Sequence, residues 1–508
     1  MTLVDAFYSI FGIFRSCFVQ ARTFERARRL ACAHLLNPGR QTISQLVRMS
    51  LECGKDWSAD YAFFSKRLWD PKKLFGAFFK EALRYSQWPH DLVVCVLDDT
   101  IRKKSGLHIP AVRTLRDTAS LPFHVNLTRA IRFIQFTLLV RPAGLYEAVR
   151  GIPVWFQEAS PAKKPGRRAS EKTHQAYKKE QMERRLGVLA RQGVDLLLKW
   201  LKEIPGKESS RLLIVADGGY CNRTFLGDLP EEVLVVARTR KDLRLYSPVT
   251  DPNAHGRPRI YGERLPTPEE MRRSEEIPWR TARIFGAGAW HDVRFKVVGP
   301  VLWKTGTGAR PWFLIIVAPL RYRKTKHGKL LYRQPAYLLC SYVEDVPVEV
   351  FLQAYFFRPE IELNNRDEKT LMGLGEAQVR SERSVRFEPA FTVLIYAVML
   401  LASLVAYGPW RTDDYLKPPR WRKKDKQRRP STMDILMLMR YEALKEREKY
   451  VLSLEQQLQA PDRKKPRGKR PRSLVEPRKR GFVSDPKSKL KPPKVPINPL
   501  TSYLYAVF

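Results

Sequence analysis

The sequence predicts an α/β protein with a helical N-terminal region and a basic C-terminal region. Apolar residues recur at helical spacing through residues 1–90. Two continuous apolar runs that end in aspartate, "DLVVCVLDDT" and "SRLLIVADGGY", are typical of buried strands. Short apolar runs separated by glycine, proline or basic turns fill residues 225–345, which favours further strands.

Composition bounds the class of partner. The chain has 508 residues, enough for two or three domains, and carries 92 Lys and Arg against 52 Asp and Glu, a formal charge of +40. Such an excess predicts a polyanionic partner, nucleic acid before an anionic membrane. A hydrophobic content of 44% with 11 tryptophans excludes a purely disordered protein.

Cysteine usage and the N-terminus predict a reducing compartment. The six cysteines are scattered and form no Cys-x-x-Cys pair, which argues against both a disulfide framework and a zinc site. The opening "MTLVDAFYSIFGIFRSCFVQ" lacks a basic start and a small-residue cleavage site, so no signal peptide is expected.

We divide the chain into five regions. Residues 1–90 form short helices, with Thr42 as a cap and Gly54 as a stop. Their outer Lys and Arg suit DNA backbone contact, although a plain solvated bundle would have the same pattern. The other four regions are the first part of the core (91–224), a β-rich block (225–345), a polar helix with an apolar helix (346–410) and a basic C-terminal region (411–508).

The last two regions each raise an alternative. "AFTVLIYAVMLLASLVAYG" is about as long as a membrane span, but we expect a buried core helix because no second span exists. An amphipathic helix at 431–458 serves either as an oligomer contact or as a piece packed onto the core. The basic segment after it is predicted to be disordered until it meets a polyanion.

Carboxylates lie at three places in the sequence that could belong to an active site. Asp98 and Asp99 follow one buried run, Asp217 follows the other, and open α/β sheets place ligand sites at such strand ends. Glu362 lies on the polar helix. Taken singly, each is better explained as a turn, a cap or a solvated residue. Together, in a basic protein, they suggest the oxygen ligands of two Mg²⁺ ions in phosphodiester cleavage.

Residues 354–369, "AYFFRPEIELNNRDEK", carry a polar stripe. Tyr355, Arg358, Glu362 and Lys369 stand at offsets 0, 3, 7 and 14, which fall within an arc of roughly 60° at about 100° per residue. A single helix would therefore present a hydroxyl, a guanidinium, a carboxylate and an ammonium on one face.

This stripe resembles the Tyr-(2)-Arg-(3)-Glu-(6)-Lys signature of a large group of DDE transposases from bacterial insertion sequences. Asp99-Thr100 is similar to the first aspartate of that group, with Asp98 as the alternative, and Asp217 is similar to the second. The run "KTLMGLGEAQVRS" is also similar to members of the group. The resemblance covers about residues 20–408.

The resemblance implies an RNase H-like core, a mixed sheet flanked by helices, with an all-β insertion before the glutamate. It also implies cut-and-paste transposition of an insertion sequence in the bacterial cytoplasm, at the nucleoid. Partners would be double-stranded DNA, both terminal inverted repeats and target, and a second copy in the synapse, but no membrane. Two Mg²⁺ ions, or Mn²⁺, would be held by Asp99, Asp217 and Glu362, and DNA phosphates by Tyr355, Arg358 and Lys369.

One departure from the group lies inside the stripe. The group usually has tryptophan after the signature arginine, and this chain has Pro359. Proline in a helix interior removes a hydrogen bond, so the helix is predicted either to kink there or to restart with Pro359 in its first turn. Glu360 then becomes a second candidate for the metal.

Three other readings compete with a transposase. An inactive or domesticated relative would bind DNA without cutting it, and Pro359 is the feature that favours it. A basic nucleic-acid scaffold protein would explain the C-terminal region but not the β-rich block. A membrane protein would rest on the apolar helix alone.

Overall fold

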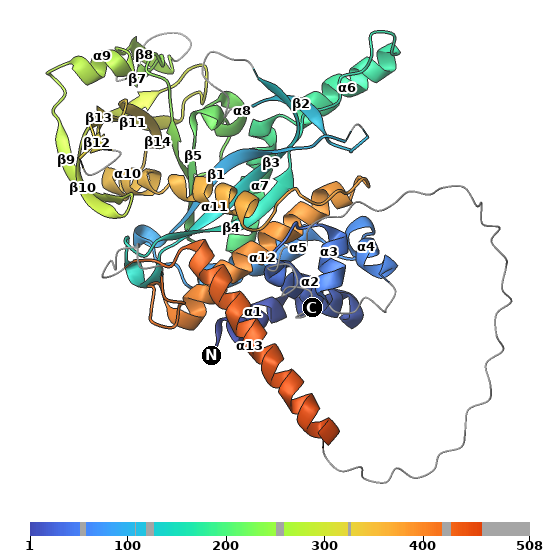
Figure 1. Cartoon of the computed structure of the whole chain (residues 1–508). Coiled ribbons are helices and arrows are strands. Elements are labelled where there is room, and N and C mark those ends of the chain that lie inside the picture. The colour runs from blue at the N-terminus through green and yellow to red at the C-terminus, as the bar shows by residue number, and fades with distance from the viewer. Residues whose placement is uncertain are drawn as a thin grey trace. The chain divides into compact units, whose positions relative to one another are not determined.

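The computed structural model describes residues 1–50, 57–106, 108–117, 126–249, 259–323, 327–418 and 428–459 (Figure 1). The chain divides into two units, Met1–Val451 and Leu452–Phe508. All that follows concerns the first unit, apart from the final residues of the last helix. The C-terminal tail that we predict to be disordered lies outside the described residues.

The N-terminal region is helical, as predicted. Thr2 and Asp5 form a reciprocal cap at the first helix, and the Thr42 hydroxyl accepts the Gln45 N–H at the third, where the sequence predicts a cap. Gly54, the expected stop, lies outside the described residues. The helices are α1 (Leu3–Gly12), α2 (Ala21–Leu36), α3 (Ile43–Met49), α4 (Ser58–Ser65) and α5 (Pro71–Leu83).

The described residues form one mixed sheet of 12 strands and a separate two-stranded sheet, β12–β13. Along the large sheet the order is β2-β3-β1-β5-β6-β14-β11-β10-β7-β8, with β4 beside β3 and β9 beside β10. The pairs β1–β5 and β5–β6 are parallel, and the other pairs are antiparallel. The strands are β1 (Leu92–Lys103), β2 (Arg113–Arg116), β3 (Leu127–Val140), β4 (Arg150–Glu158), β5 (Arg211–Ala216), β6 (Val233–Arg238), β7 (Tyr246–Pro248), β8 (Tyr261–Arg264), β9 (Arg280–Gly286), β10 (Ala289–Leu302), β11 (Pro311–Val317), β12 (Arg321–Arg323), β13 (Leu330–Tyr332) and β14 (Ala336–Ser341).

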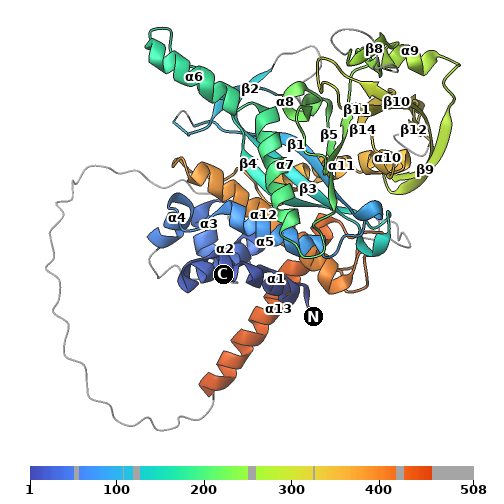
Figure 2. The same ribbon diagram turned by 180° about the vertical axis from the view of Figure 1, so that it is seen from behind.

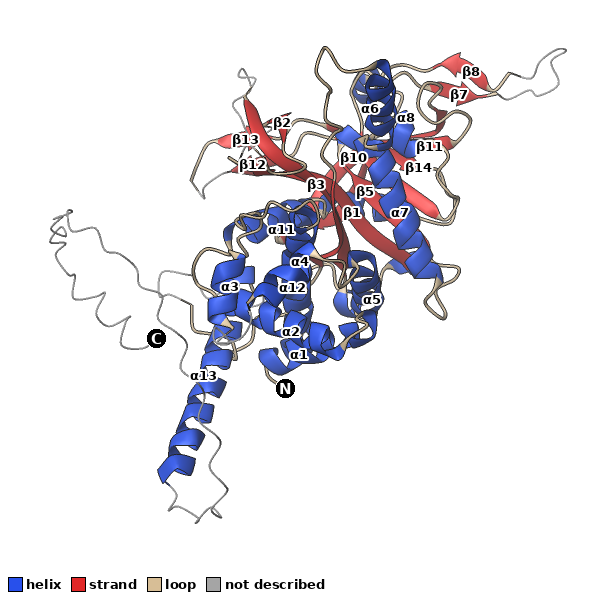
Figure 3. Ribbon diagram, turned by 90° about the vertical axis from the view of Figure 1, so that its right-hand side faces the viewer, coloured by secondary structure: helices blue, strands red, loops and turns tan. Residues whose placement is uncertain are grey.

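Helices cover both faces of this sheet (Figure 3). Val93, Cys95 and Leu97 of β1 pack in the core cluster that contains α5, α7 (Leu186–Lys202) and α12 (Ser384–Tyr407). The alternate residues Val94 and Val96 pack against α10 (Val348–Phe356) and α11 (Pro359–Thr370). This arrangement is consistent with an RNase H-like DDE fold.

The β-rich block differs from the all-β insertion that the resemblance implies. Its first strand, β6, pairs in parallel with β5, and β14 pairs with β6, so the block extends the core sheet. It also contains a short helix, α9 (Pro268–Arg273). The reason is the run "VLVVA", which is apolar on both faces and is buried as a central strand.

The apolar helix predicted near residue 390 is α12. It is the one described helix long and apolar enough to cross a membrane, and 78% of its apolar window is buried inside the protein. It packs against α1, α4, α5 and β4, so it is the central core helix that we expected.

The amphipathic helix is α13 (Thr432–Gln459). Ile435, Leu436, Leu438 and Met439 in its first turns are buried, which agrees with the packing alternative for this part of the helix. Two helices remain: α8 (Arg223–Leu226), and α6 (Glu171–Glu183), which stands away from the sheet in Figures 1 and 2.

Candidate active site

The two neighbouring aspartates lie inside β1, whereas the sequence predicted them at the end of a strand. β1 continues to Lys103 because β3 pairs with it over that length, whereas β5 stops at Ala216, opposite Leu97. From Asp98 onward, the edge of β1 on the β5 side has no strand neighbour among the described residues. The two aspartates are therefore partly exposed at this point.

Strand alternation sends the two aspartates to opposite faces. Asp98 follows the parity of Val94 and Val96 and lies on the face that α11 covers, whereas Asp99 follows Cys95 and Leu97. Because Leu97 pairs with Ala216, Asp98 is also next to Asp217, the residue that follows β5. Asp98 and Asp217 thus stand side by side at the ends of the paired segments.

The electrostatics of the first aspartate reflect this crowding. Burial raises the pKa of Asp98 to about 7, and the charges of Asp99 and Asp217 act in the same direction. The Asp99 N–H, which donates to Asp98 Oδ1 at 2.8 Å, and the Arg358 charge oppose the rise in pKa. A bound cation would therefore stabilise the ionised form of Asp98.

Asp99 has different partners. The Tyr220 hydroxyl donates to its Oδ1 at 3.2 Å, and Arg132 Nε lies 3.4 Å from its Oδ2. Burial raises the pKa of Asp99, and Arg132 with Tyr220 opposes the rise. The charge of Asp217 adds to the rise, and the Asp99 carboxylate is already engaged by Tyr220 and Arg132.

The stripe from Tyr355 to Lys369 spans two helices and not one. α10 ends at Phe356, and α11 starts with Pro359 at its first position, so the restart is the correct one of the two predictions. The break is tight, since the Arg358 N–H bonds the Tyr355 carbonyl at 3.0 Å and the Ile361 N–H bonds the Arg358 carbonyl at 3.3 Å. The local cause is that proline has no N–H to continue α10.

Arg358 joins the second aspartate to the glutamate. Its Nη2 lies 2.7 Å from Glu362 Oε1, and its Nη1 lies 4.0 Å from Asp217 Oδ1. The Arg358 side chain is 19% exposed, while those of Asp217 and Glu362 are 44% and 52% exposed. Burial lowers the pKa of Arg358, but the two carboxylates bring it above its ordinary value. The structure therefore gathers Asp98, Asp217 and Glu362 around one guanidinium.

The other two stripe residues lie on either side of this cluster. Tyr355 is half-buried and lines a pocket of about 440 Å³ with Arg238 and Arg358, and burial raises its pKa. Lys369 is exposed and lines a pocket of about 790 Å³ together with Asp99 and Glu362. Phosphates on both sides of the carboxylates would meet cations.

The sequence analysis missed most of the cations in this larger pocket. Only Arg102 could have been predicted from the sequence, because it follows Asp98 by four residues and so lies on the same face of β1. The others come together only through the fold. The additional basic residues that line it are Arg40, Arg102, Lys103, Arg116, Arg132 and Arg366.

Glu360, the second candidate for the metal, is occupied elsewhere. Both its oxygens accept from Arg429, at 2.9 and 3.0 Å, and Oε2 also accepts the Gly151 N–H at 2.9 Å. Burial opposes its ionisation, yet these partners hold the pKa of Glu360 below its ordinary value. It fastens α11 to β4 and is turned away from the cluster around Arg358.

Within the described ranges, no group of three or more His, Cys, Asp or Glu side chains is arranged to hold a metal ion. The contacts of Arg358 explain this, since the guanidinium bridges Asp217 and Glu362. The donor set itself fits a hard divalent cation, because three carboxylates, one of them with a raised pKa, converge on one positive charge.

Comparison with known proteins identifies the family. The family described as DDE superfamily endonuclease matches residues 13–295, more than half of the chain and including both aspartate-bearing strands. A search of curated proteins found no match. Endonucleases of this superfamily act on DNA and generally use divalent metal ions. With its mixed sheet, its strand-borne aspartates and this match, the chain belongs to the DDE superfamily endonucleases.

Proposed function

We propose that this endonuclease is a DNA transposase that moves an insertion sequence by a cut-and-paste route. The observation that carries the proposal is the grouping of Asp98, Asp217 and Glu362 around Arg358 in a chain of this family. The formal charge of +40 suits a protein that holds long stretches of DNA.

We assign the first metal-binding position to Asp98 in place of Asp99. Asp98 follows the parity of the β1 residues that pack against α11, and it neighbours both Asp217 and Arg358. Asp99 lines a pocket with Glu362, but its carboxylate already accepts from Tyr220 and lies beside Arg132. Two Mg²⁺ ions, or Mn²⁺, held by the three carboxylates would activate the attacking oxygen and stabilise the leaving oxygen.

The remaining stripe residues would bind the DNA strand. Once the carboxylates hold cations, Arg358 is released to bind a phosphate with both nitrogens, and Tyr355 lies in the same pocket. Lys369, about 10 Å along α11 from Glu362 at 1.5 Å per residue, would hold a second phosphate. These contacts position the strand so that the bond to be cut faces Asp98 and Asp217.

The substrates would be the terminal inverted repeats of the element and then its target DNA. A freed 3′-hydroxyl would attack the target, and two copies of the chain would hold the two ends together. The reaction would take place at the nucleoid in the bacterial cytoplasm.

A second candidate function is DNA binding without cleavage. The feature that favours it is the restart of α11 at Pro359, which leaves Arg358 paired with both Glu362 and Asp217. In such a relative, the guanidinium would keep the cations out.

The test uses plasmid DNA that carries the element's own ends, with Mg²⁺ or with EDTA. We expect metal-dependent cuts at the ends by wild type, and a loss of roughly 10³-fold or more in Asp98→Asn and in Glu362→Gln, because each removes a ligand of the cations. Asp99→Asn is the matched control, one residue away, and should retain most of the activity.

Each contrary result has a clear meaning. If Asp99→Asn abolishes cleavage and Asp98→Asn does not, the assignment of the first aspartate is wrong. If wild type binds the ends and never cuts them, the second candidate function replaces the first.

A further inference from the structure

A helical arm projects from the core beside the candidate active site. We call residues 163–185, which connect β4 to α7 and include α6, the α6 arm. α6 has 13 residues, all of them described, and none of its side chains is buried. Figures 1 and 2 show it standing clear of the sheet from opposite sides.

The arm is strongly basic. It contains nine Lys and Arg against three Asp and Glu. Most of these cations are exposed and have no ion-pair partner among the described residues, so their charge is directed to solvent. These cations are Lys163, Lys164, Arg167, Arg168, Lys172, Lys178, Lys179 and Arg185.

An unpacked helix of this length has little to stabilise it by itself. Isolated helices shorter than about 12–15 residues are marginal in water, and most helices in proteins are held by an apolar face. α6 has no such face, since Met182 is 54% exposed and the other apolar residues are few. Its many exposed Lys and Arg side chains are instead typical of a surface that binds a negatively charged partner.

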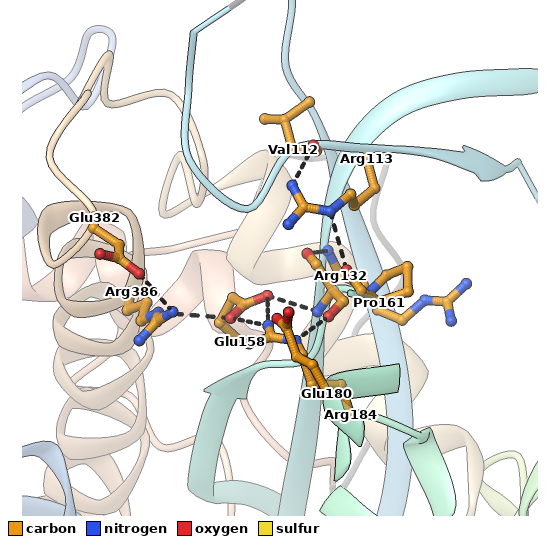
Figure 4. A network of polar contacts seen from close by, with 10 residues as sticks. Val112, Arg113, Arg132, Glu158, Pro161, Glu180, Arg184, Glu382 and Arg386 are labelled. Carbon is orange, nitrogen blue, oxygen red and sulfur yellow. Dashed lines mark hydrogen bonds and ion pairs between the residues drawn. The ribbon is translucent and has the colours of Figure 1, made fainter. Parts of the chain in front are cut away.

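The base of the arm is fixed to the core, as Figure 4 shows. Arg184 donates to both oxygens of Glu158 at the end of β4, at 2.7 and 2.6 Å, and to the Ser160 carbonyl at 2.7 Å. Arg386, in the first turn of α12, lies 3.6 Å from the same carboxylate. The Glu158 side chain is only 4% exposed, so this junction is an anchored one.

The same junction borders the pocket that Asp99, Glu362 and Lys369 line, because Arg132 is part of that lining. The Arg132 N–H donates to Ser160 Oγ at 3.2 Å, and Arg132 Nε lies 3.4 Å from Asp99. Two short contacts therefore connect the root of the arm to the strand that carries Asp98. DNA bound in that pocket would therefore lie next to the root of the arm.

We propose that the α6 arm binds the phosphate backbone of duplex DNA next to the bond that is cut. Complementary charge identifies the partner, because eight exposed cations on an anchored arm match the regular negative charge of a duplex. The proposal rests on the proposed function only in taking DNA as the substrate. Contacts to the backbone of this kind add affinity and orientation without reading sequence.

The experiment measures binding of the full chain to a linear duplex in EDTA, so that no strand is cut, over a range of salt concentrations. The arm variant is Lys172→Gln, Lys178→Gln, Lys179→Gln. The matched control, Lys199→Gln, Lys241→Gln, Arg244→Gln, removes the same charge from exposed residues that also lack ion-pair partners in the described part of the chain. A third variant, with arginine at the three arm positions, keeps the charge.

We expect the arm variant to bind more weakly, with a salt slope lower by up to about 2.7, because the slope falls by about 0.9 for each phosphate that the protein no longer neutralises. The arginine variant and the control should keep the wild-type slope. An arm variant with the wild-type slope overturns the arm proposal while leaving the transposase proposal intact. Failure of the wild-type chain to bind any duplex overturns both.

Discussion

At the scale of single residues, the pleat of β1 decides between two chemically identical neighbours. Asp98 and Asp99 differ in the face they occupy, and both feel the charge of Asp217, but only Asp98 feels that of Arg358, whereas Asp99 is bonded by Tyr220 and lies beside Arg132. Successive side chains of a strand point to opposite faces of the sheet, so neighbouring residues contact different groups. The choice of metal ligand is therefore a question of register.

The buried residue His34 should make the stability of the folded chain depend on pH. His34 is 2% exposed, its Nε2 lies 3.0 Å from the Met372 carbonyl, and burial lowers its pKa to about 4 from an ordinary value of 6.5. The unfolded chain takes up a proton below pH 6.5 that the folded chain refuses until about pH 4. His34 therefore contributes to the free energy of unfolding above pH 6.5. This contribution is lost as the pH falls, by about 2 kcal/mol at pH 5.

The measurement is thermal unfolding at pH 5 and pH 7.5. Replacement of this histidine in His34→Gln should reduce the difference in Tm between the two pH values, because glutamine does not titrate. An unchanged difference would show that His34 does not drive the acid sensitivity.

At the scale of elements, α11 is held at both ends by a residue just before α13 and by the first residue of α13. Arg429 bonds Glu360 in the first turn of α11, and the Thr432 hydroxyl donates to Asp367 in the last turn at 2.6 Å. Between them lies Glu362. The position of the candidate metal ligand thus depends on residues about 70 positions later, outside the part of the chain that matches the family.

Breaking this clamp should be costly. Arg429→Met leaves Glu360, 14% exposed, without the guanidinium that bonds both its oxygens, and we expect a loss of about 3 kcal/mol in the free energy of unfolding. The double variant Glu360→Met, Arg429→Met should recover part of the loss, since the unpaired carboxylate is then absent, and the recovery is partial because the buried Arg150 also loses the opposite charge of Glu360. Chemical denaturation measures both. Equal destabilisation by the single and double variants would argue that packing, and not charge pairing, is what Arg429 contributes.

At the scale of the whole molecule, α13 brings the two ends of the described chain together. Glu442 accepts the Val4 N–H at 3.0 Å and the Tyr407 hydroxyl at 2.6 Å, and Arg440 donates to carbonyls at the end of α2. The N-terminal helices, the core helix α12 and the α11 clamp therefore form one connected body. The excess positive charge is distributed over this body and over the tail.

The tail should contribute to DNA affinity without contributing to stability. Residues 460–508 contain 14 Lys and Arg against three Asp and Glu. Truncation after Gln459 should lower the salt slope of DNA binding by about 0.9 for each phosphate the tail neutralises. The Tm should stay the same, because the first unit ends at Val451. A truncated chain with an unchanged slope would assign the affinity to the body alone.

Much of the fold follows from local patterns in the sequence. The buried runs before Asp98 and Asp217 are strands, the apolar stretch is the core helix α12, and Thr42 caps α3, because each depends on a few neighbouring residues. Pro359 marked the boundary of a helix for the same reason. The joining of β6 and β14 to the core sheet was not predictable, since strand pairing is a contact between distant segments.

By itself the sequence determined which chemical groups this endonuclease has and their spacing along the chain: aspartates after buried apolar runs, a polar stripe that includes Glu362, and a strong positive charge. Tertiary structure decided which groups meet. The β1–β5 register set Asp98 beside Asp217, the contact with Arg429 removed Glu360 from the cluster, and the helix break placed Arg358 between two carboxylates. The physical reason is that spacing is a local property of the chain, whereas register and ion pairing depend on residues far apart in it.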